Sequence, residues 1–278
     1  MKCPKFLIIF ILSSIVTILS ALAMIKLEPV KRPFLCNDPK LSLPARQSTI
    51  TGTVLFGWTL LAPLIIILIC EFLSDRSETK SIGEKLSINW KKLSYLYRFY
   101  IINFAMQSVF VTVAKVTTGS HRPHFFETCQ PDKLINCTAN SYVFDFTCTK
   151  TKISEFYLRD SSMSFFSGHA MYMTYSCFFL IFYLHYRLRS RKFTFLLTFL
   201  QSLLISFAFF GSISRLFDNR HHVVDITIGA AIGILSSIHV WFIHCKNFEF
   251  NNVKDNGEKY DIQYRDEEIM PVNSSSSN

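Results

Sequence analysis

The stretch FTFLLTFLQSLLISFAFFGSIS, residues 193–214, carries no charged residue over twenty-two positions. A helix of roughly 20 residues crosses the hydrocarbon core of a bilayer, which is about 30 Å thick, so this stretch is long enough to span a membrane. It is followed at once by RLFDNRHHVVD, residues 215–225, which holds two arginines, two histidines and two aspartates. Ionisable groups at membrane depth are costly, so a dense group of them at the end of an apolar segment indicates a functional site.

Similar apolar segments recur along the chain. Half of the 278 residues are hydrophobic and 18% are charged, against about 25% charged in an average soluble domain. Residues 6–25 and 47–70 are long uncharged runs, and residues 99–114, 170–184 and 226–242 are shorter ones that alternate with the long runs. Tyr, Trp, Lys and Arg at their ends are typical interfacial anchors, which favours spans over buried core helices.

The sequence therefore predicts an all-α integral membrane protein, with six transmembrane helices in one bundle. We expect one domain over residues 1–250 and a disordered cytoplasmic tail over residues 251–278, because the tail mixes charges with Asn and Ser and has little to bury. The expected spans are residues 6–25, 50–71, 94–115, 168–186, 193–213 and 223–244.

The first apolar segment has a second interpretation as a cleavable signal peptide. MKCPK at its start is basic, and ALA at residues 21–23 supplies small residues at its end. The apolar run is longer than the roughly 7–15 residues of a signal h-region, so we favour a retained helix.

Charge in the loops predicts the orientation. Four basic residues lie between positions 187 and 192, and such clusters stay cytoplasmic. Alternation then places both termini in the cytoplasm and residues 26–46, 115–162 and 214–222 outside, although the first of these loops is also basic. Asn136 begins a glycosylation sequon in an outward loop. An oxidising compartment would let outward cysteines pair, in a connectivity that the sequence does not specify: Cys36, Cys129, Cys137 and Cys148.

The partners that composition indicates are membrane lipids. We attribute the net charge of +9 to topology and to contact with anionic lipid, not to nucleic acid, because no soluble domain carries an interleaved aromatic and basic patch. We expect a multi-pass protein of the plasma membrane, with the endoplasmic reticulum or Golgi as alternatives. A homo-oligomer is left open by the sequence.

Three polar clusters should meet at the outward membrane surface: KVTTGSHRP at residues 115–123, SFFSGHA at residues 164–170, and the stretch over residues 214–225. Together they would gather three fixed positive charges beside a hydroxyl and a glycine near a helix N-terminus. Arg forks and free backbone N–H groups bind phosphate oxygens, so this composition predicts a phosphate site. The residues concerned are Lys115, Arg122, Arg215, Ser167 and Gly168.

Histidines would supply the chemistry at that site. His169 could give a proton to a leaving oxygen, and a second histidine held by a carboxylate could attack phosphorus. On a helix, Asp225 would share a face with both His221, four residues before it, and His222, three before it, so spacing does not choose between them. The carboxylate would fix the tautomer of the attacking ring and leave its other nitrogen free.

The patterns K-x6-R-P at residues 115–123, S-G-H at 167–169 and S-R-x5-H-x3-D at 214–225 resemble, in order and spacing, the signature of the type 2 phosphatidic acid phosphatase superfamily. The closest resemblance is to the animal lipid phosphate phosphatases, whose first outward loop is similar to KRPFLCNDPKLSLP at residues 31–44. Phe166 stands where the broad superfamily often has Pro, and lipid-specific members accept an aromatic residue there.

The resemblance implies the role of each residue. His221 would be the nucleophile that forms a phosphohistidine, Asp225 would orient it, and His169 would be the acid for the leaving group and later the base for water. It also implies phosphate binding by Lys115, Arg122, Ser167, Gly168 and Arg215.

The implied substrates are phosphatidate, lysophosphatidate, ceramide 1-phosphate and sphingosine 1-phosphate. We expect no metal or other cofactor, because the protein's own cations would stabilise the charge.

Other interpretations give these residues different roles. A non-catalytic membrane protein that binds lipid phosphates, or a phosphatase for another phosphate ester, would keep the same cluster of cations. Imidazoles also bind metals, so His121, His124, His221 and His222 form an alternative metal site. Gly229 and Gly233 make a G-x-x-x-G pattern, which predicts close helix packing within the bundle rather than a dimer contact.

Overall fold

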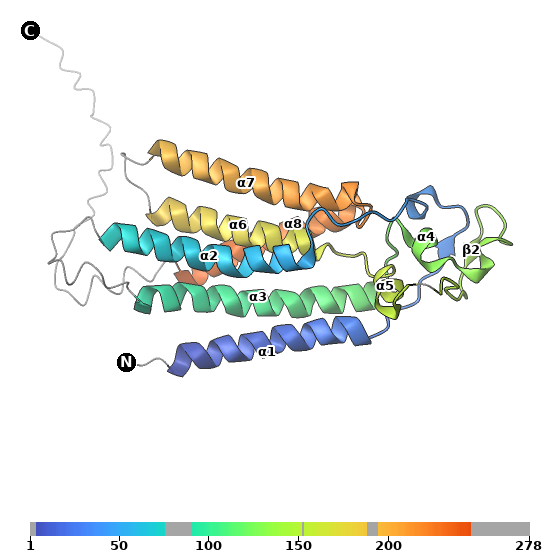
Figure 1. The fold of residues 1–278 in the computed structure, drawn as a ribbon, viewed down its shortest axis with the longest axis horizontal. Helices are drawn as coiled ribbons and strands as arrows, with labels where there is room; N and C mark the ends of the chain where they lie inside the picture. Colours follow the sequence, from blue (N-terminus) through green and yellow to red (C-terminus); the bar gives the residue numbers. More distant parts are fainter. Residues whose placement is uncertain (1–3, 76–89, 152, 188–193, 246–278) are drawn as a thin grey trace, which may run out of the picture.

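Long helices lie side by side and form a bundle in the computed structural model, with a small cap of loops at one end (Figure 1). The structure describes residues 4–75, 90–151, 153–187 and 194–245. The expected tail, residues 251–278, and most of the basic segment at residues 187–192 lie outside this part of the chain. The long helices are α1 (Pro4–Lys26), α2 (Gly52–Asp75), α3 (Trp90–Thr118), α6 (Gly168–Arg187), α7 (Thr194–Phe217) and α8 (Val223–His239), which continues as a π-helix over Val240–Cys245.

Five of these helices are long and apolar enough to cross a membrane within the described residues. The large hydrophobic side chains on the outer faces of α1 and α7 are exposed, as contact with lipid requires. The prediction of an all-α protein with several membrane spans therefore holds. The five segments are Leu7–Lys26, Gly52–Glu71, Leu93–Thr118, Thr194–Phe217 and Val223–Cys245.

Helix α6 is the expected span that lacks this hydropathy. It is 20 residues long and contains Tyr, Ser, Thr and His, and twelve of its residues are buried. It packs against α2, α7 and α8 in the middle of the bundle (Figure 1). A helix surrounded by other helices can carry polar side chains that lipid-facing helices cannot. The count of six membrane spans stays a prediction for this reason.

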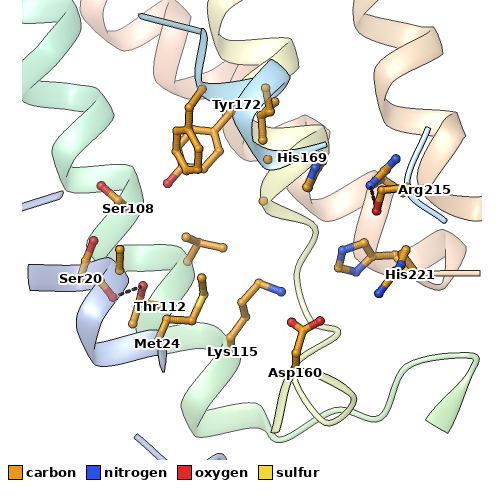
Figure 2. Close-up of a pocket in the computed structure, with 18 of the residues that line it drawn as sticks. Ser20, Met24, Ser108, Thr112, Lys115, Asp160, His169, Tyr172, Arg215 and His221 are labelled. Carbon is orange, nitrogen blue, oxygen red and sulfur yellow. Dashed lines mark hydrogen bonds between the residues drawn. The ribbon is translucent and has the colours of Figure 1, made fainter. Parts of the chain in front are cut away.

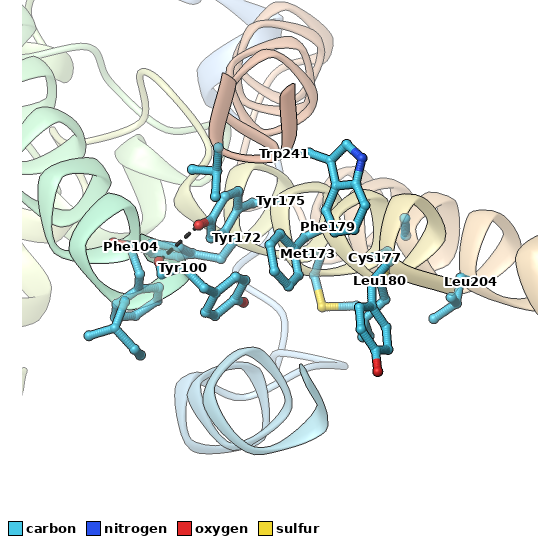
Figure 3. Close-up of a cluster of buried hydrophobic side chains, with 14 of the residues drawn as sticks. Tyr100, Phe104, Tyr172, Met173, Tyr175, Cys177, Phe179, Leu180, Leu204 and Trp241 are labelled. Carbon is cyan, nitrogen blue, oxygen red and sulfur yellow. Dashed lines mark hydrogen bonds between the residues drawn. The ribbon is translucent and has the colours of Figure 1, made fainter. Parts of the chain in front are cut away.

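Tyrosines join α6 to its neighbours in the core of the bundle (Figure 3). The rings of Tyr100 on α3 and Tyr175 on α6 stack with centroids 4.8 Å apart. The Tyr175 hydroxyl donates to the Tyr100 carbonyl at 2.8 Å, and the Tyr100 hydroxyl donates to the Thr59 carbonyl of α2 at 2.7 Å. Because buried phenols need a hydrogen-bond acceptor, these pairs fix the relative positions of three helices.

Helices α6 and α8 approach each other most closely at two glycines. A methyl group at Gly229 would overlap the carbonyl oxygen of Ser167, and one at Gly233 would overlap the carbonyl of Met171 and the hydroxyl of Thr174. The prediction that the G-x-x-x-G pattern packs within the bundle is therefore confirmed, and its partner is α6.

The loops at one end of the bundle form the cap (Figure 1). Strand β1 (Phe34–Leu35) pairs antiparallel with β2 (Tyr142–Val143), and the short helices α4 (Phe125–Cys129) and α5 (Glu155–Asp160) lie beside them. Two disulfides, Cys36–Cys137 and Cys129–Cys148, cross-link the cap. The four outward cysteines thus form two pairs. Single-turn 3-10 helices lie at Pro39–Leu41 and Asp132–Leu134.

Candidate active site

A cavity of about 330 Å³ opens where the bundle meets the cap (Figure 2). Its walls come from α1, α2, α3, α5, α6 and α7 and from the loop that joins α7 to α8. Residues far apart in the sequence therefore share one space. Six of the eight predicted site residues line it: Lys115, Arg122, Gly168, His169, Arg215 and His221.

The other two predicted residues, Ser167 and Asp225, lie directly behind the cavity wall. Both are buried, and the backbone N–H of Ser167 donates to the Asp225 carbonyl at 3.0 Å. The Ser167 hydroxyl lies 3.4 Å from the backbone nitrogen of Ala170, so it caps the first turn of α6. The motif that ends α7 and begins α8 is thus fixed to the start of α6.

Two arginines of the cavity are each held by an aspartate. Arg122 donates through Nη2 to Asp160 Oδ1 at 2.6 Å and through Nε to the Asp160 carbonyl at 2.7 Å. Arg215, which is 1% exposed, forms an ion pair with Asp218. Asp218 also accepts hydrogen bonds from the backbone and hydroxyl of Thr49 at 2.9 and 2.7 Å. These contacts orient the guanidinium groups before any ligand binds.

Lys115 supplies a further cation to the cavity, from the last turns of α3. Its Nζ donates to the Met163 carbonyl at 2.6 Å, and the side chain points into the cavity (Figure 2). The Met163 carbonyl belongs to the segment that leads into α6, so α3 and α6 are joined at the cavity. An ammonium group has three donors, which leaves two for a ligand.

His221 and His222 precede α8 rather than lying on it. The helix begins at Val223 and His222 is its N-cap, so the expectation that a helical face brings both histidines to Asp225 is wrong. A capping box replaces it: the Asp225 carboxylate accepts a hydrogen bond from the His222 backbone at 3.0 Å. Only His221 lines the cavity of Figure 2, whereas His222 Nε2 contacts the His121 carbonyl at 3.1 Å.

Ser164 lies between His221 and Asp225, and it is not among the predicted site residues. Nδ1 of His221 is 3.8 Å from Oδ2 of Asp225, too far for a hydrogen bond. The Ser164 hydroxyl donates to that Oδ2 at 2.6 Å and lies 3.5 Å from His221 Nδ1. All three side chains are buried. The carboxylate therefore reaches the imidazole through a hydroxyl.

The environment of His221 keeps its imidazole neutral. Burial, followed by the positive charges of Arg122 and Lys115 and by His169, lowers the pKa of His221 well below its ordinary value. A neutral imidazole has a free electron pair on one nitrogen. Since Nδ1 faces Ser164 and Asp225, that pair belongs to Nε2.

His169 stands at the start of α6 and lines the same cavity. Its Nε2 lies 3.2 Å from the Ile50 carbonyl, which holds the ring in place. The structure therefore brings two imidazoles and four cations to one cavity, from three stretches of the chain: residues 115–122, residue 169 and residues 215–221. The fourth cation, Arg220, is not among the predicted site residues. The cations of such a site can bind an anionic group. Its imidazoles can transfer protons or accept a phosphoryl group from the bound ligand.

The alternative metal site is not assembled in the part of the chain that the structure describes. No three His, Cys, Asp or Glu side chains converge there as ligands of one ion. His121 contacts the Arg32 carbonyl at 2.9 Å and the Ser162 hydroxyl at 3.1 Å. Nδ1 of His124 contacts the Thr128 hydroxyl at 2.7 Å.

Asp160 and Asp218 are site residues that the sequence did not reveal. Asp218 follows Arg215 by three residues at the end of α7, a spacing that could have indicated the ion pair. Asp160 lies in the long outward loop and meets Arg122 only through the fold of the cap, so no sequence pattern marks it.

Comparisons with known proteins find one family and several relatives of this chain. A family model described as the PAP2 superfamily matches residues 96–249. Phospholipid phosphatase 1 of Mus musculus is 32% identical over 232 residues, which are 76% of each chain. Phospholipid phosphatase 2 of Bos taurus is 30% identical over 223 residues, 77% of this chain and 74% of that protein.

A Drosophila melanogaster protein whose name includes the words phosphatidate phosphatase is 30% identical over 233 residues. That match covers 77% of this chain and spans 61% of the length of the fly protein. No solved structure is matched by the chain. The family model covers more than half of the chain and the matched relatives most of it, so the resemblance seen in three short motifs is confirmed: this chain belongs to the PAP2 superfamily.

Proposed function

We propose that this protein is a lipid phosphate phosphatase. Its substrates would be phosphate monoesters of phosphatidate, lysophosphatidate, ceramide 1-phosphate or sphingosine 1-phosphate. The observation that carries this proposal is the cavity, which has four cations and two histidines at one end and continues between apolar helices. The names of the matched phospholipid phosphatases support it.

The shape of the cavity suits a phosphorylated lipid. Beyond Lys115 it continues between α1, α2, α3 and α6 (Figure 2). Ala21 of α1 and Phe56 of α2 line it and are themselves exposed, so it reaches the flank of the bundle between these helices. A headgroup can occupy the charged end while its acyl chain lies toward the bilayer.

Phosphate binding would use the cations and the first turn of α6. Arg122 and Arg215 are already oriented by their aspartates, and Lys115 has free donors. Helix α6 begins at Gly168, and the free backbone N–H groups at a helix N-terminus bind anions. Charge on the transferring phosphoryl group is stabilised mainly by such fixed donors, which supply in this chain what metal ions supply in other phosphatases.

The reaction would proceed in two steps. Nε2 of His221 attacks phosphorus, the bond from phosphorus to the lipid oxygen breaks, and His169 gives that oxygen a proton. His169 then takes a proton from water, the water oxygen bonds to phosphorus, and the bond between phosphorus and Nε2 breaks. The products are the dephosphorylated lipid and inorganic phosphate.

Phosphate release from phosphatidate by the detergent-solubilised protein in excess EDTA tests this function. The comparison is between wild type, His221→Ala and His222→Ala, which remove adjacent imidazoles that differ in access to the cavity. We expect wild type to be active in EDTA, His221→Ala to lose at least about 10⁴-fold in kcat, and His222→Ala to stay active.

Three results would contradict the proposal. Equal losses of kcat in His221→Ala and His222→Ala would show that His221 is not the specific nucleophile. Loss of wild-type activity in EDTA, with recovery on adding a divalent ion, would show that a metal is required. Binding of lipid phosphates without release of phosphate from any of the four substrates would favour the non-catalytic lipid-binding protein.

A further inference from the structure

The uncharged part of the cavity contains a group of side-chain hydroxyls, which we call the hydroxyl band. It comprises Thr17 and Ser20 of α1 and Ser108 and Thr112 of α3 (Figure 2). At a rise of 1.5 Å per residue, Thr112 lies about 4.5 Å and Ser108 about 10.5 Å along α3 from Lys115. The band therefore begins one helical turn from the charged end of the cavity.

Each hydroxyl of the band has already donated its proton to a backbone carbonyl. A hydroxyl has one proton and two lone pairs, so each of these oxygens can only accept a further hydrogen bond. The hydrogen bonds run from Thr17 to Ser13 at 2.8 Å, from Ser20 to Thr17 at 2.8 Å, from Ser108 to Ala105 at 2.9 Å and from Thr112 to Ser20 at 3.3 Å. The Ser108 hydroxyl also forms a hydrogen bond with the Tyr172 hydroxyl of α6, which lines the same cavity. The band thus presents acceptors to the cavity, and the one at Ser108 is shared with Tyr172.

Other helical hydroxyls in the bundle donate in the same way but face outward. Thr198, Ser202 and Thr227 each donate to the carbonyl four residues earlier and are exposed. The hydroxyl band differs because two helices direct it into one cavity. The lone pairs of these oxygens can take a further hydrogen bond, so a ligand that supplies a donor here gains a contact that an apolar ligand does not.

We propose that the hydroxyl band binds hydrogen-bond donors on the backbone of the lipid, next to the phosphate. The site then favours lipid phosphates with a free hydroxyl, amide or amine over diacyl lipids, whose esters are only acceptors. Lysophosphatidate, ceramide 1-phosphate and sphingosine 1-phosphate have such donors within a few bonds of the phosphate, and phosphatidate has none. This inference rests on the proposed function, since it places the phosphate beside Lys115.

A single-group change in the substrate tests the band most directly. We would compare a 1-acyl lysophosphatidate with its 2-deoxy analogue of the same chain length, which lacks only the free hydroxyl. A neutral hydrogen bond contributes about 0.5–1.5 kcal/mol, so wild type should prefer the hydroxylated lipid in kcat/KM by roughly 2- to 13-fold. Thr112→Val and Ser108→Ala should each reduce this preference toward one.

Thr117→Val is the matched control for Thr112→Val. Thr117 lies on the same helix, is exposed, and does not line this cavity, so the preference should not change. Thr112 donates across to α1, so Thr112→Val also removes a contact between α1 and α3. Ser108 donates within α3 and contacts Tyr172 of α6, so Ser108→Ala leaves the contact between α1 and α3 intact.

A binding measurement tests the hydroxyl band independently of the proposed phosphatase activity. The dissociation constants of the two lipids are measured with the His221→Ala protein, in which no phosphoryl transfer to that histidine occurs. The same preference of roughly 2- to 13-fold is expected there, whether or not wild type releases phosphate. Equal affinities for the two lipids, or an equal change in Thr117→Val and Thr112→Val, would overturn the inference.

Discussion

At the scale of single residues, the arrangement around His221 depends on a residue that its motif does not contain. Asp225 is fixed by the capping box at the start of α8, and Ser164 by its hydrogen bond to that carboxylate. With its proton given to Asp225, the Ser164 oxygen can accept from Nδ1–H of His221, 3.5 Å away. We infer a relay that holds His221 in the tautomer with a free Nε2.

Replacing Ser164 by Ala should therefore lower kcat by about tenfold, a change of roughly 1.4 kcal/mol in the barrier, and leave KM unchanged. The reason is that the attacking tautomer loses the hydroxyl that links it to Asp225, while its contact with the Ser164 backbone and the phosphate contacts remain. Initial rates across substrate concentrations give both constants. Ser237→Ala is the matched control, because Ser237 is equally buried and donates only within α8.

A double-mutant cycle with Asp225→Asn distinguishes the relay from a packing effect. Residues that act as one unit give non-additive losses, so Ser164→Ala should cost little more in protein that already carries Asp225→Asn. Fully additive losses in kcat would show that Ser164 acts independently of the carboxylate.

Residue types and motif order were predictable from sequence, but the geometry at His221 was not. Spacing left His221 and His222 equivalent, and only the turn before α8 separates them, by directing one into the cavity. Ser164 lies 61 residues before Asp225, so its contact is a property of the fold.

At the scale of elements, the contact between α6 and α8 fixes the position of the site. Gly229 lies against the carbonyl of Ser167, at the first turn of α6, and Gly233 lies one turn further along. The sequence predicted close packing at these glycines but not the partner helix, since a small-residue pattern fits any helix surface. The sequence also predicted the five strongly apolar helices, because a long uncharged run marks each of them. Helix α6 has a shorter uncharged run and several polar residues, so its sequence is less distinctive.

Gly229→Ala and Gly233→Ala should both destabilise the bundle, by about 1–3 kcal/mol, because an added methyl group overlaps backbone atoms of α6. Gly229→Ala should also lower kcat, since it displaces Ser167 and the start of α6. Thermal unfolding in detergent and phosphate release measure the two effects.

Gly57→Ala provides the control for these substitutions. It lies within α2, and a methyl group there would meet nothing within 4 Å. Alanine should be neutral or stabilising at Gly57, by up to about 1 kcal/mol, since glycine is the poorer helix former. A Gly229→Ala protein as stable as Gly57→Ala would show that α6 and α8 can move apart at little cost.

At the scale of the whole molecule, the cap lies at one end of the bundle (Figure 1). The disulfides lie within the cap, and the charged end of the cavity adjoins it through Arg122 and α5. Asn136 belongs to this cap and is exposed, so a glycan could be attached without disturbing the fold. The proposed orientation, with cytoplasmic termini and an outward site, requires the cap to face the compartment in which glycosylation occurs.

Expression in a glycosylating cell therefore tests the orientation. Wild type should migrate faster on a gel after enzymatic removal of N-linked glycans, because Asn136 carries one. Asn136→Gln and Thr138→Ala should both abolish the shift, since the sequon needs both residues. An unshifted wild type, together with glycosylation of a sequon introduced between residues 76 and 89, would show the reverse orientation.

The opening of the cavity at the flank of the bundle, beside Ala21 and Phe56, has a kinetic consequence. A lipid that enters there arrives by diffusion within the plane of the membrane. The rate then follows the mole fraction of substrate among the surrounding lipids rather than its amount per litre. Diluting the bilayer with an inert lipid slows such an enzyme even when the composition of the aqueous phase is unchanged.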